Sequence, residues 1–417
     1  RQFVRKIRKR RNKSVKKVVT FQDIKVLHCE NEDIKNTVKS ILDEKSSNFP
    51  KSQDSLILVK PNLNNYLPSL LGGTTDIRII DGVLSYLHTL GYKNVVLADG
   101  SNIGIHHNKF NIFNILGLDS LAKSYGYRVV DLNNTDSIEI KLGSRTTKLA
   151  KICKESDYFI NLPKIKTHTE AGLSICMKNL MGCLVGFNKR QVHLGLFEKR
   201  RKMGERLYQL NQILKPDLHI VDGLIAMEGD GPSAGKPRKL DLLIYGEDPL
   251  KIDWLCAKLL GFQPEKIPYF PKNYSEKVDN NNIPMFNDFK KPQLNIFGQI
   301  FLRNLFAHRL RTIGFLDKIF MSSFVSWVLI SLGIRQEDIN IISSHPKVKE
   351  LRLDHSNCDS CSICSVYCPV DIKLEEENFD FKNSKCIKCL NCYYICPNNS
   401  ISIVGDNVSK LEGIRHL

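Results

Sequence analysis

Residues 358–369 read CDSCSICSVYCP, and residues 386–397 read CIKCLNCYYICP. Both segments follow the pattern C-x2-C-x2-C-x3-C-P. Gaps of two residues let three thiolates converge on one [4Fe–4S] cubane, while the cysteine before the proline ligates the other cluster. We therefore expect two [4Fe–4S] clusters, cluster one on Cys358, Cys361, Cys364 and Cys396, and cluster two on Cys386, Cys389, Cys392 and Cys368.

Zinc and disulfide bonds are the alternative explanations for these cysteines. A zinc ribbon uses two pairs of ligands per metal and accounts neither for a third cysteine nor for the following proline. A disulfide framework is typical of small secreted domains, whereas eight of the 13 cysteines here fall within residues 358–396. Among the others, Cys153 and Cys256 lie in apolar patterns typical of buried thiols. Cys176 and Cys183 are two helical turns apart, so a redox pair or extra ligands on one helix face stay open for them.

Residues 357–404 resemble bacterial-type two-cluster ferredoxins, with ISI at 401–403 where the closing strand of that small domain falls. The resemblance implies a small α+β domain. Cluster chemistry of this kind places the chain in a reducing cytoplasm, and it makes a small redox carrier or redox protein an expected partner.

An α/β domain is expected upstream, because short β-branched segments alternate with amphipathic helical stretches over residues 18–262. The expected strands cover residues 56–60, 94–99, 127–131, 157–161, 218–222 and 241–245, and the clearest helices cover 76–90 and 249–260. This alternation predicts a mostly parallel sheet flanked by helices. In such sheets, ligands bind just past the carboxyl ends of the strands.

The remaining segments lie outside the expected α/β domain. We expect a basic arm at 1–17, a linker at 263–294, a helical apolar segment at 295–349, the ferredoxin-type domain at 350–405 and a tail at 406–417. Residues 319–334 contain no charge but are fewer than a membrane-spanning helix needs. Core packing is the favoured interpretation of this segment, and peripheral membrane contact is the alternative.

The net charge of +17 would be typical of a nucleic-acid-binding protein if it were spread over a folded surface. Ten basic and no acidic residues instead lie in residues 1–17, so most of the excess belongs to this arm. No aromatic residues interleave with it in a stacking pattern, and we expect no specific nucleic-acid partner. No apolar stretch follows the arm, so a signal peptide is not expected.

Polar side chains gather where the expected strands end. The sequence NLPKIKTH at 161–168 follows one strand, and we take residues 164–168 as the junction between that strand and a helix. Cations at such a junction favour an anionic ligand such as a carboxylate or a phosphate. The expected binding cleft for this anionic small molecule or cofactor uses Lys60, Asn62, Asn161, Lys164, Lys166 and Asn179, with Lys178 and His168 as candidate catalytic groups.

A second polar group follows the strand at 218–222. Asp222, Glu228 and Asp230 stand among glycines, so they are candidates for substrate contacts or for a divalent cation, and turn formation is the competing explanation. His193 is a further acid–base candidate. No G-x-G-x-x-G follows an early strand, and neither a P-loop nor a G-x-S-x-G motif is present. Nicotinamide, nucleoside triphosphate and serine-hydrolase chemistry therefore lack their usual motifs.

Several motifs together resemble the domain-of-unknown-function 362 family, whose members are often fused to a ferredoxin module. They are VKPN at 59–62, DGS at 99–101, NLPKIKTH at 161–168, KNLMG at 178–182, DG at 222–223 with GDGP at 229–232, and DP at 248–249 with Asp253. The resemblance spans residues 18–262 and implies an α/β fold with a polar site, but no reaction.

Two hypotheses follow for the activity. In the first, the chain is an oxidoreductase that passes electrons from the clusters to an anion held in the α/β domain, with His168 or His193 supplying protons. In the second, it is a non-catalytic electron-transfer or cluster-donating partner that binds another protein or a metallocofactor.

Overall fold

The computed structural model describes residues 18–29, 33–66, 68–107, 109–193, 198–233, 235–276, 285–292, 347–376, 379–408 and 411. The expected basic arm at 1–17 lies outside these residues, as does the apolar segment at 295–349 apart from its last three positions. Those three begin strand β13 (Lys347–Leu353), which runs into the ferredoxin-type domain expected from residue 350. None of the helices in the described ranges has the length and apolar character that crossing a membrane requires.

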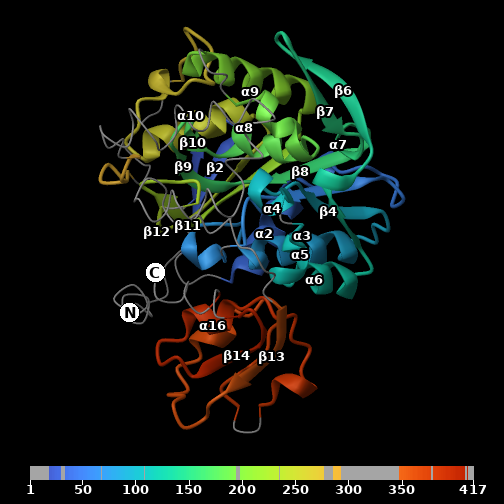
Figure 1. The fold of residues 1–417 in the computed structure, drawn as a ribbon, viewed down its shortest axis with the longest axis vertical. Coiled ribbons are helices and arrows are strands. Elements are labelled where there is room, and N and C mark those ends of the chain that lie inside the picture. The colour runs from blue at the N-terminus through green and yellow to red at the C-terminus, as the bar shows by residue number, and fades with distance from the viewer. Residues whose placement is uncertain are drawn as a thin grey trace.

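One ten-stranded sheet forms the core of the α/β domain (Figure 1). Its strands lie in the order β1-β2-β12-β11-β8-β3-β4-β5, and β9 pairs with both β11 and β10. The pairs from β11 through β8, β3 and β4 to β5 are parallel, and those from β1 to β11 are antiparallel. The strands are β1 (Val18–Phe21), β2 (Ile24–His28), β3 (Ile57–Pro61), β4 (Val95–Asp99), β5 (Arg128–Asp131), β8 (Tyr158–Leu162), β9 (Lys164–His168), β10 (Gly172–Ser174), β11 (Leu218–Glu228) and β12 (Lys236–Gly246).

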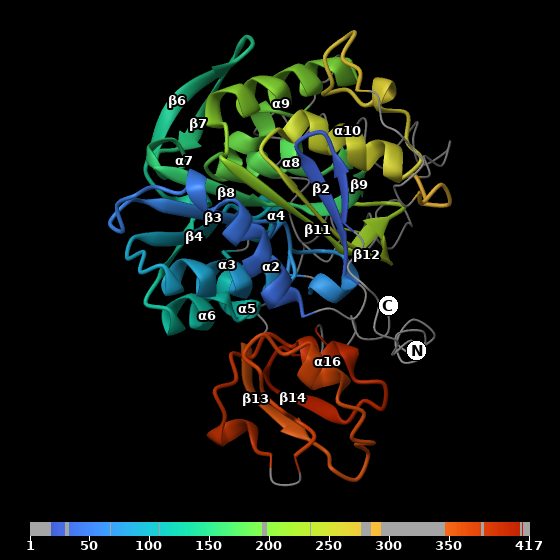
Figure 2. The same ribbon diagram turned by 180° about the vertical axis from the view of Figure 1, so that it is seen from behind.

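Helices cover both faces of this sheet, as Figures 1 and 2 show from opposite sides. Alternate residues of each central strand point to opposite faces. In β3, Ile57 and Val59 pack into the core with α2 and α3, while Leu58 packs into the core with α9 and α10. The other elements are α2 (Ile34–Glu44), α3 (Ile77–Thr89), α4 (Ile103–His107), α5 (Ile112–Ile115), α6 (Leu118–Ser124), α7 (Ile152–Glu155), α8 (Cys176–Asn179), α9 (Arg200–Leu214), α10 (Pro249–Leu259) and the hairpin of β6 (Ser137–Leu142) and β7 (Arg145–Ala150). The expected sheet flanked by helices is therefore confirmed.

Two sequence expectations near the carboxyl ends of the strands are wrong. Residues 164–168 form β9 and do not lead into a helix, because they pair with β10 on one side and β11 on the other. Asp222 is followed by six further residues of β11, so it lies inside a strand and not at its end. Gly223 permits this course, since a Cβ there would approach Ile165 Cδ1 at 3.0 Å and Leu242 O at 3.1 Å.

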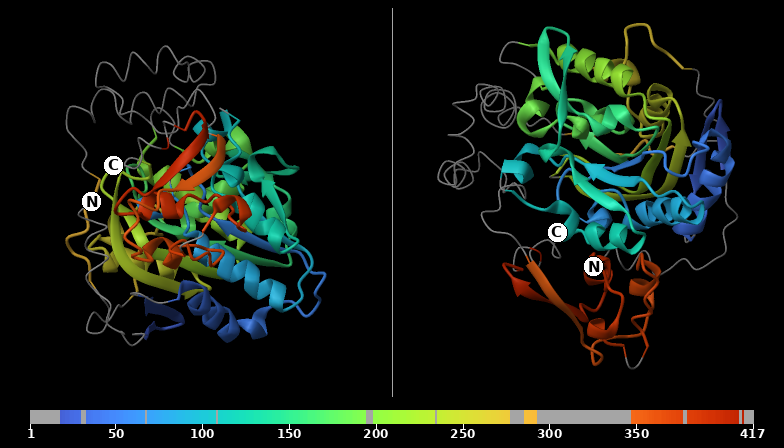
Figure 3. Two further views of the ribbon diagram at one scale, coloured as in Figure 1. Left: turned by 90° about the horizontal axis from the view of Figure 1, so that it is seen from below. Right: turned by 90° about the vertical axis from the view of Figure 1, so that its right-hand side faces the viewer.

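The ferredoxin-type domain is a small α+β unit. Strand β13 pairs antiparallel with β14 (Ile401–Asp406), and the short helices α15 (Ile363–Val366) and α16 (Asn391–Ile395) carry ligand cysteines. It lies at one end of the α/β domain with α16 toward that domain and the two strands farther away (Figures 1 and 3). Its apolar residues Leu351, Ile387 and Tyr393 belong to the same buried cluster as helices α2 and α3. The two domains therefore share a continuous core.

Gly117 is a point of close approach between the domains. It has φ of +73°, and a Cβ on it would lie 2.5 Å from Ile387 O and 3.1 Å from the backbone nitrogen of Cys389. Only glycine therefore lets the α5–α6 turn pack directly on the loop that carries the cluster-two cysteines.

Gly117→Ala should separate this contact and destabilise the protein by about 1–3 kcal/mol through overpacking and backbone strain. Gly126→Ala is a matched control, because Gly126 has φ of +74° but no atom within 4 Å of the place that a Cβ would occupy. Hydrogen–deuterium exchange should show residues 385–392 exposed in the first variant and protected in the second. Equal protection in both variants would contradict the role of this contact.

Candidate functional site

The two cysteine loops have the same unusual backbone. In the first, Ser360 and Ser362 flank Cys361 with φ of +51° and +57°, and in the second, Lys388 and Leu390 flank Cys389 with +56° and +63°. Residues other than glycine adopt positive φ at a cost of about 1–3 kcal/mol each, so such strain is retained where the surroundings require it. The repetition at equivalent positions indicates two equivalent binding loops.

This backbone directs N–H groups at the cysteine sulfurs. Backbone nitrogens of Lys388, Ile372 and Ser400 donate to the Sγ atoms of Cys386, Cys368 and Cys396 at 3.4, 3.4 and 3.3 Å. Hydrogen bonds to sulfur stabilise the negative charge of thiolate ligands and tune cluster potential. The loops therefore fit [4Fe–4S] clusters, which supply single electrons when bound.

The structure also brings together the cysteines that each cluster needs. Burial raises the pKa of Cys364 to about 11, and the adjacent Cys396 thiolate adds to this effect. Burial likewise raises the pKa of Cys389 to about 12, with contributions from Cys368 and Cys386. The fourth cysteine of each motif thus lies beside the opposite loop, as the crossed ligand sets require.

Other metal and thiol hypotheses are not supported. Within the described ranges, no three His, Cys, Asp or Glu side chains are grouped so that they could hold a metal ion. The divalent-cation site suggested for Asp222, Glu228 and Asp230 therefore stays a prediction. No disulfide is present among the 13 cysteines, all of which are described. Cys176 and Cys183 share no helix, because α8 ends at Asn179 and a 3-10 turn follows. Cys183 contacts Cys153 and Cys176 lies near Cys256, and all four thiols are buried.

Two buried ion pairs lie under the carboxyl ends of the parallel strands. Lys60 Nζ is 2.6 Å from Asp99 Oδ1, and Lys164 Nζ is 2.8 Å from Asp222 Oδ2. All four side chains are at most 3% exposed. Each of these two lysines is therefore paired with a carboxylate, and the substrate contacts expected for them stay a prediction.

A chain of amide side chains continues from Lys166. Its Nζ donates to Asn62 Oδ1 at 2.7 Å, Asn62 donates to Asn179 at 2.8 Å, Asn179 donates to Asn161 at 2.7 Å, and Asn161 Nδ2 lies 2.9 Å from His219 Nδ1. Burial lowers the pKa of His219 to about 3, so its ring is neutral and can accept this last bond. All five residues are buried. The amides therefore fix the position of the Lys166 ammonium.

Lys166 and Lys178 are two cations of this region that lack a carboxylate in hydrogen-bonding contact among the described residues. Lys189 is a third, and it donates to Asn133 Oδ1 and to Leu184 O. Burial, followed by the charges of Lys178 and Lys164, lowers the pKa of Lys166 to about 7. Burial also lowers the pKa of Lys178 to about 8, against the opposing effect of Glu170. Lys178 is half-buried, whereas Lys166 is fully covered. An anion near them would offset an excess of buried positive charge.

The two candidate histidines lie next to this pair. His168 Nδ1 accepts from the backbone nitrogens of Glu170 and Ala171 at 3.1 and 3.2 Å, so a neutral His168 carries its proton on Nε2. The His168 and His193 rings are 6.5 Å apart, and His193 Nδ1 is 2.8 Å from Glu170 Oε2. Glu170 thus orients His193 and also acts on Lys178, and sequence reasoning missed it.

The expected residues therefore fall into a buried network and not an open cleft. Lys60, Asn62, Asn161, Lys164, Lys166, Asn179 and Asp222 are all between 0% and 6% exposed. Asp230 lies apart from the network, half-buried in the turn after β11, where its neighbour Gly231 donates to Thr167 Oγ1. The carboxylates Asp99 and Asp76 pair with Lys60 and Arg78. Sequence reasoning missed the Asp99–Lys60 pair, because nothing local in the sequence signals that these two residues meet.

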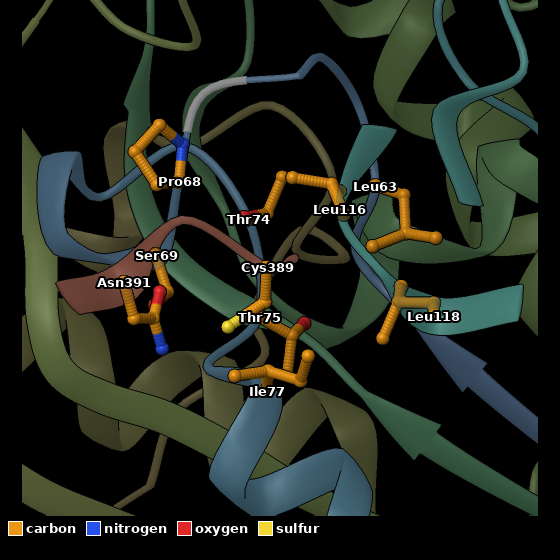
Figure 4. Close-up of a pocket in the computed structure, with 10 residues that line it drawn as sticks. All are labelled: Leu63, Pro68, Ser69, Thr74, Thr75, Ile77, Leu116, Leu118, Cys389 and Asn391. Carbon is orange, nitrogen blue, oxygen red and sulfur yellow. The ribbon is translucent and has the colours of Figure 1, made fainter. Parts of the chain in front are cut away.

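The loop of residues 68–77 joins this network to the ferredoxin-type domain. On one side, Gly73 O accepts from Lys166 Nζ at 2.9 Å. On the other side, Ser69, Thr75 and Ile77 line a crevice with about 270 Å³ of empty space that Cys389 also lines (Figure 4). One short loop thus separates a ligand of cluster two from a buried ammonium group.

A second connection between the buried network and the ferredoxin-type domain runs through charged side chains. Arg78 binds the Asp76 carboxylate through two nitrogens at 3.0 and 2.8 Å, and its guanidinium lies 4.2 Å from the centre of the Tyr367 ring. Tyr367 directly precedes Cys368, a ligand expected for cluster two. The backbone nitrogen of Asp76 donates to Asp222 Oδ2 at 2.6 Å. Burial would raise the pKa of Asp76, but Arg78 holds it below its usual value.

Comparison with known protein families supports both the α/β domain and the iron–sulfur domain. The profile of the family described as domain of unknown function (DUF362) matches residues 57–258, and that of a 4Fe-4S dicluster domain matches residues 350–397. The chain thus carries a DUF362 domain joined to a 4Fe-4S dicluster domain. It therefore carries an iron–sulfur domain of the kind that transfers electrons, and the DUF362 match covers the ion pairs, the amide chain and the lysine pair.

Curated relatives match only in part. A thylakoid-associated protein of Synechocystis is 36% identical over 121 residues, which are 29% of this chain and 38% of that protein. Pyruvate synthase subunit PorD of Methanocaldococcus jannaschii is 39% identical over 54 residues, 12% of this chain and 63% of that subunit. The chain thus spans less than two thirds of each. The lactate racemase apoprotein of Thermoanaerobacterium thermosaccharolyticum has a TM-score of 0.26 at 10% identity, covering 50% of this chain and 52% of that one, which supports no further argument.

Paired serine substitutions test the crossed ligand sets. Cys358→Ser with Cys396→Ser should disable one cluster and leave about four irons per chain, because both residues belong to cluster one. Cys386→Ser with Cys396→Ser should disable both clusters. Iron and sulfide analysis of anaerobically purified protein distinguishes these outcomes, and equal iron contents in the two variants would contradict the assignment.

Breaking a buried ion pair should be costly. Lys164→Met leaves Asp222 buried without its counter-ion, and we expect a loss of about 3–5 kcal/mol in the free energy of unfolding. Adding Asp222→Leu should recover part of this loss. Lys151→Met in the exposed Lys151–Glu155 pair is the control and should cost less than about 1 kcal/mol. Urea unfolding measures all three, and a small effect of Lys164→Met would contradict the pairing.

Proposed function

We propose that the chain is an oxidoreductase in which cluster two exchanges electrons, across the loop of residues 68–77, with an anionic substrate or cofactor beside Lys166 and Lys178. The observation that carries this proposal is the position of that loop. It accepts a hydrogen bond from Lys166 on one side and lines the same crevice as Cys389 on the other. Electron transfer weakens steeply with distance, so such a short separation favours exchange.

The electrostatics favour an anion at this place. Lys166 and Lys178 are both more easily deprotonated than ordinary lysines, because each is buried without a contacting carboxylate. A carboxylate or phosphate group would raise their pKa values again and hold them charged. Preorganised cations of this kind stabilise negative charge that develops during reduction.

Protons for a reduction are available on the same side. His168 presents its Nε2, and His193 is held by Glu170, so either ring can donate to a bound group. Lys178 is half-buried, and this makes its side of the network the most direct approach for a ligand. Cluster chemistry also supports a reducing cytoplasm as the location.

Burial of Lys60, Lys164 and Lys166 favours an alternative function. In it, the chain is a non-catalytic electron-transfer or cluster-donating protein that binds another protein or a metallocofactor through the α/β domain. Lys164→Ala and His168→Ala would then weaken complex formation in an anaerobic pull-down, with no turnover to lose.

Peripheral membrane contact through residues 1–17 and 319–334 is a separate proposal, tested by co-sedimentation with anionic liposomes at low salt.

Substitution of Lys178 tests the oxidoreductase. Clusters reduced anaerobically should be reoxidised by members of a panel of small carboxylates and phosphate esters, followed by absorbance. Lys178→Met should slow this reoxidation about tenfold or more, while Lys141→Met, at an exposed lysine on β6, should leave it unchanged.

The pH dependence gives an independent check. Because anion binding needs protonated lysines, the wild-type rate should fall as pH rises through about 7 to 8. Lys178→Met should flatten the upper part of this fall. The proposal fails if no anion reoxidises the wild type, or if Lys178→Met reacts at the wild-type rate.

A further inference from the structure

The two clusters have different surroundings. Around Cys358 and Cys361, most of the loop residues are exposed, namely Asp354, His355, Ser356, Asn357, Asp359 and Ser360. In the second loop, Ile387, Leu390, Asn391 and Cys392 are buried against the rest of the protein. The Cys358–Cys361 end of cluster one is therefore exposed, whereas the loop of cluster two packs against the rest of the protein.

Carboxylates lie beside cluster one. Asp359 Oδ1 accepts from the backbone nitrogen of Cys361 at 3.3 Å, and Glu375 accepts from Oγ of Ser365, which directly follows Cys364. Asp354 accepts from Asn357 Nδ2 at 2.6 Å, directly before Cys358. Cluster one is thus bordered by three carboxylates.

The loop of cluster two carries two exposed lysines, Lys385 and Lys388. Two carboxylates, Asp371 and Asp76, also lie near cysteines of this cluster. Carboxylates therefore border both clusters, and the loop of residues 354–361 at cluster one differs in that it contains no lysine.

An apolar side chain lies between the ligands of the two clusters. Val366 is 60% exposed at the end of α15, between Cys364 and Cys368 in the sequence. Among the described residues, few other large apolar side chains are as exposed. An exposed apolar contact beside charged groups is a common feature of transient protein interfaces.

We propose that Asp354, Asp359, Glu375 and Val366 form an electron-receiving surface that binds a small redox protein with a basic face. One electron passes from that donor to cluster one and then to cluster two, with no bond made or broken. Complementary charge would speed the encounter and orient the partner. This inference extends the proposed function. Only the later transfer of the electron from cluster two to the α/β domain rests on that function.

Cytochrome c, a basic haem protein, is a suitable probe of this surface. The double variant Asp354→Asn with Asp359→Asn removes two charges but keeps oxygens that can accept the local hydrogen bonds. At low ionic strength, it should bind cytochrome c about three- to tenfold more weakly than the wild type, and the difference should vanish at high salt. Binding is measured by calorimetry with the oxidised holoprotein, so no turnover is needed.

Two further variants complete the experiment. Glu139→Gln with Glu155→Gln makes the same change in net charge on exposed positions of the α/β domain and should bind like the wild type. Val366→Ser should weaken binding at high salt as well as at low salt. Equal weakening by both double variants, or wild-type binding by Asp354→Asn with Asp359→Asn, would overturn the proposed surface. Lys178→Met should bind normally, which separates this test from that of the oxidoreductase.

Discussion

The position of the loop of residues 68–77, which accepts a hydrogen bond from Lys166 and lines a crevice with Cys389, is the constraint on which the rest of the arrangement depends. Gly72 places this loop directly on β11, where a Cβ would lie 2.6 Å from Ala226 O. Gly117 allows the cluster-two loop to pack equally closely on the α5–α6 turn. Without the close packing at Gly72 and Gly117, the iron–sulfur domain and the lysine network would belong to one chain but would not pack together. With it, the loop of residues 68–77 lies between them.

The buried charges of this network cost desolvation free energy, so their presence calls for an explanation. Ion pairs such as Lys60–Asp99 rarely add net stability over apolar packing, so a cluster of them is retained for another reason. Gly182 covers this pair so tightly that a Cβ would lie 2.2 Å from Asp99 Oδ1. The ion pairs and the amide chain hold the surrounding groups in place, while Lys166 and Lys178 keep positive charge that no contacting carboxylate among the described residues neutralises. Binding at this place requires an approach past the half-buried Lys178.

The sequence predicts what is local and misses what depends on distant partners. The spacing of the cysteines is sufficient to predict the two cluster-binding loops. The β-branched segments between amphipathic helices are sufficient to predict the parallel strands. Residues 164–168 follow one expected strand and precede an expected helical stretch, so the sequence predicts a junction there. Only the distant Asp222 and Asn62 make buried lysines acceptable in a strand at this place. Glu170 was missed because its role depends on His193, which lies four elements farther along the chain.

The most direct test of the account is the effect of Asp76→Asn on the cluster potentials. Asp76 lies near Cys389 and forms an ion pair with Arg78, so this change adds one positive charge beside cluster two and keeps a side chain able to cap α3. In redox titrations followed by electron paramagnetic resonance, one cluster should shift upward, on the order of tens of millivolts, and the other should stay nearly unchanged. Equal shifts of both clusters, or no shift of either, would contradict the placement of cluster two against the lysine network.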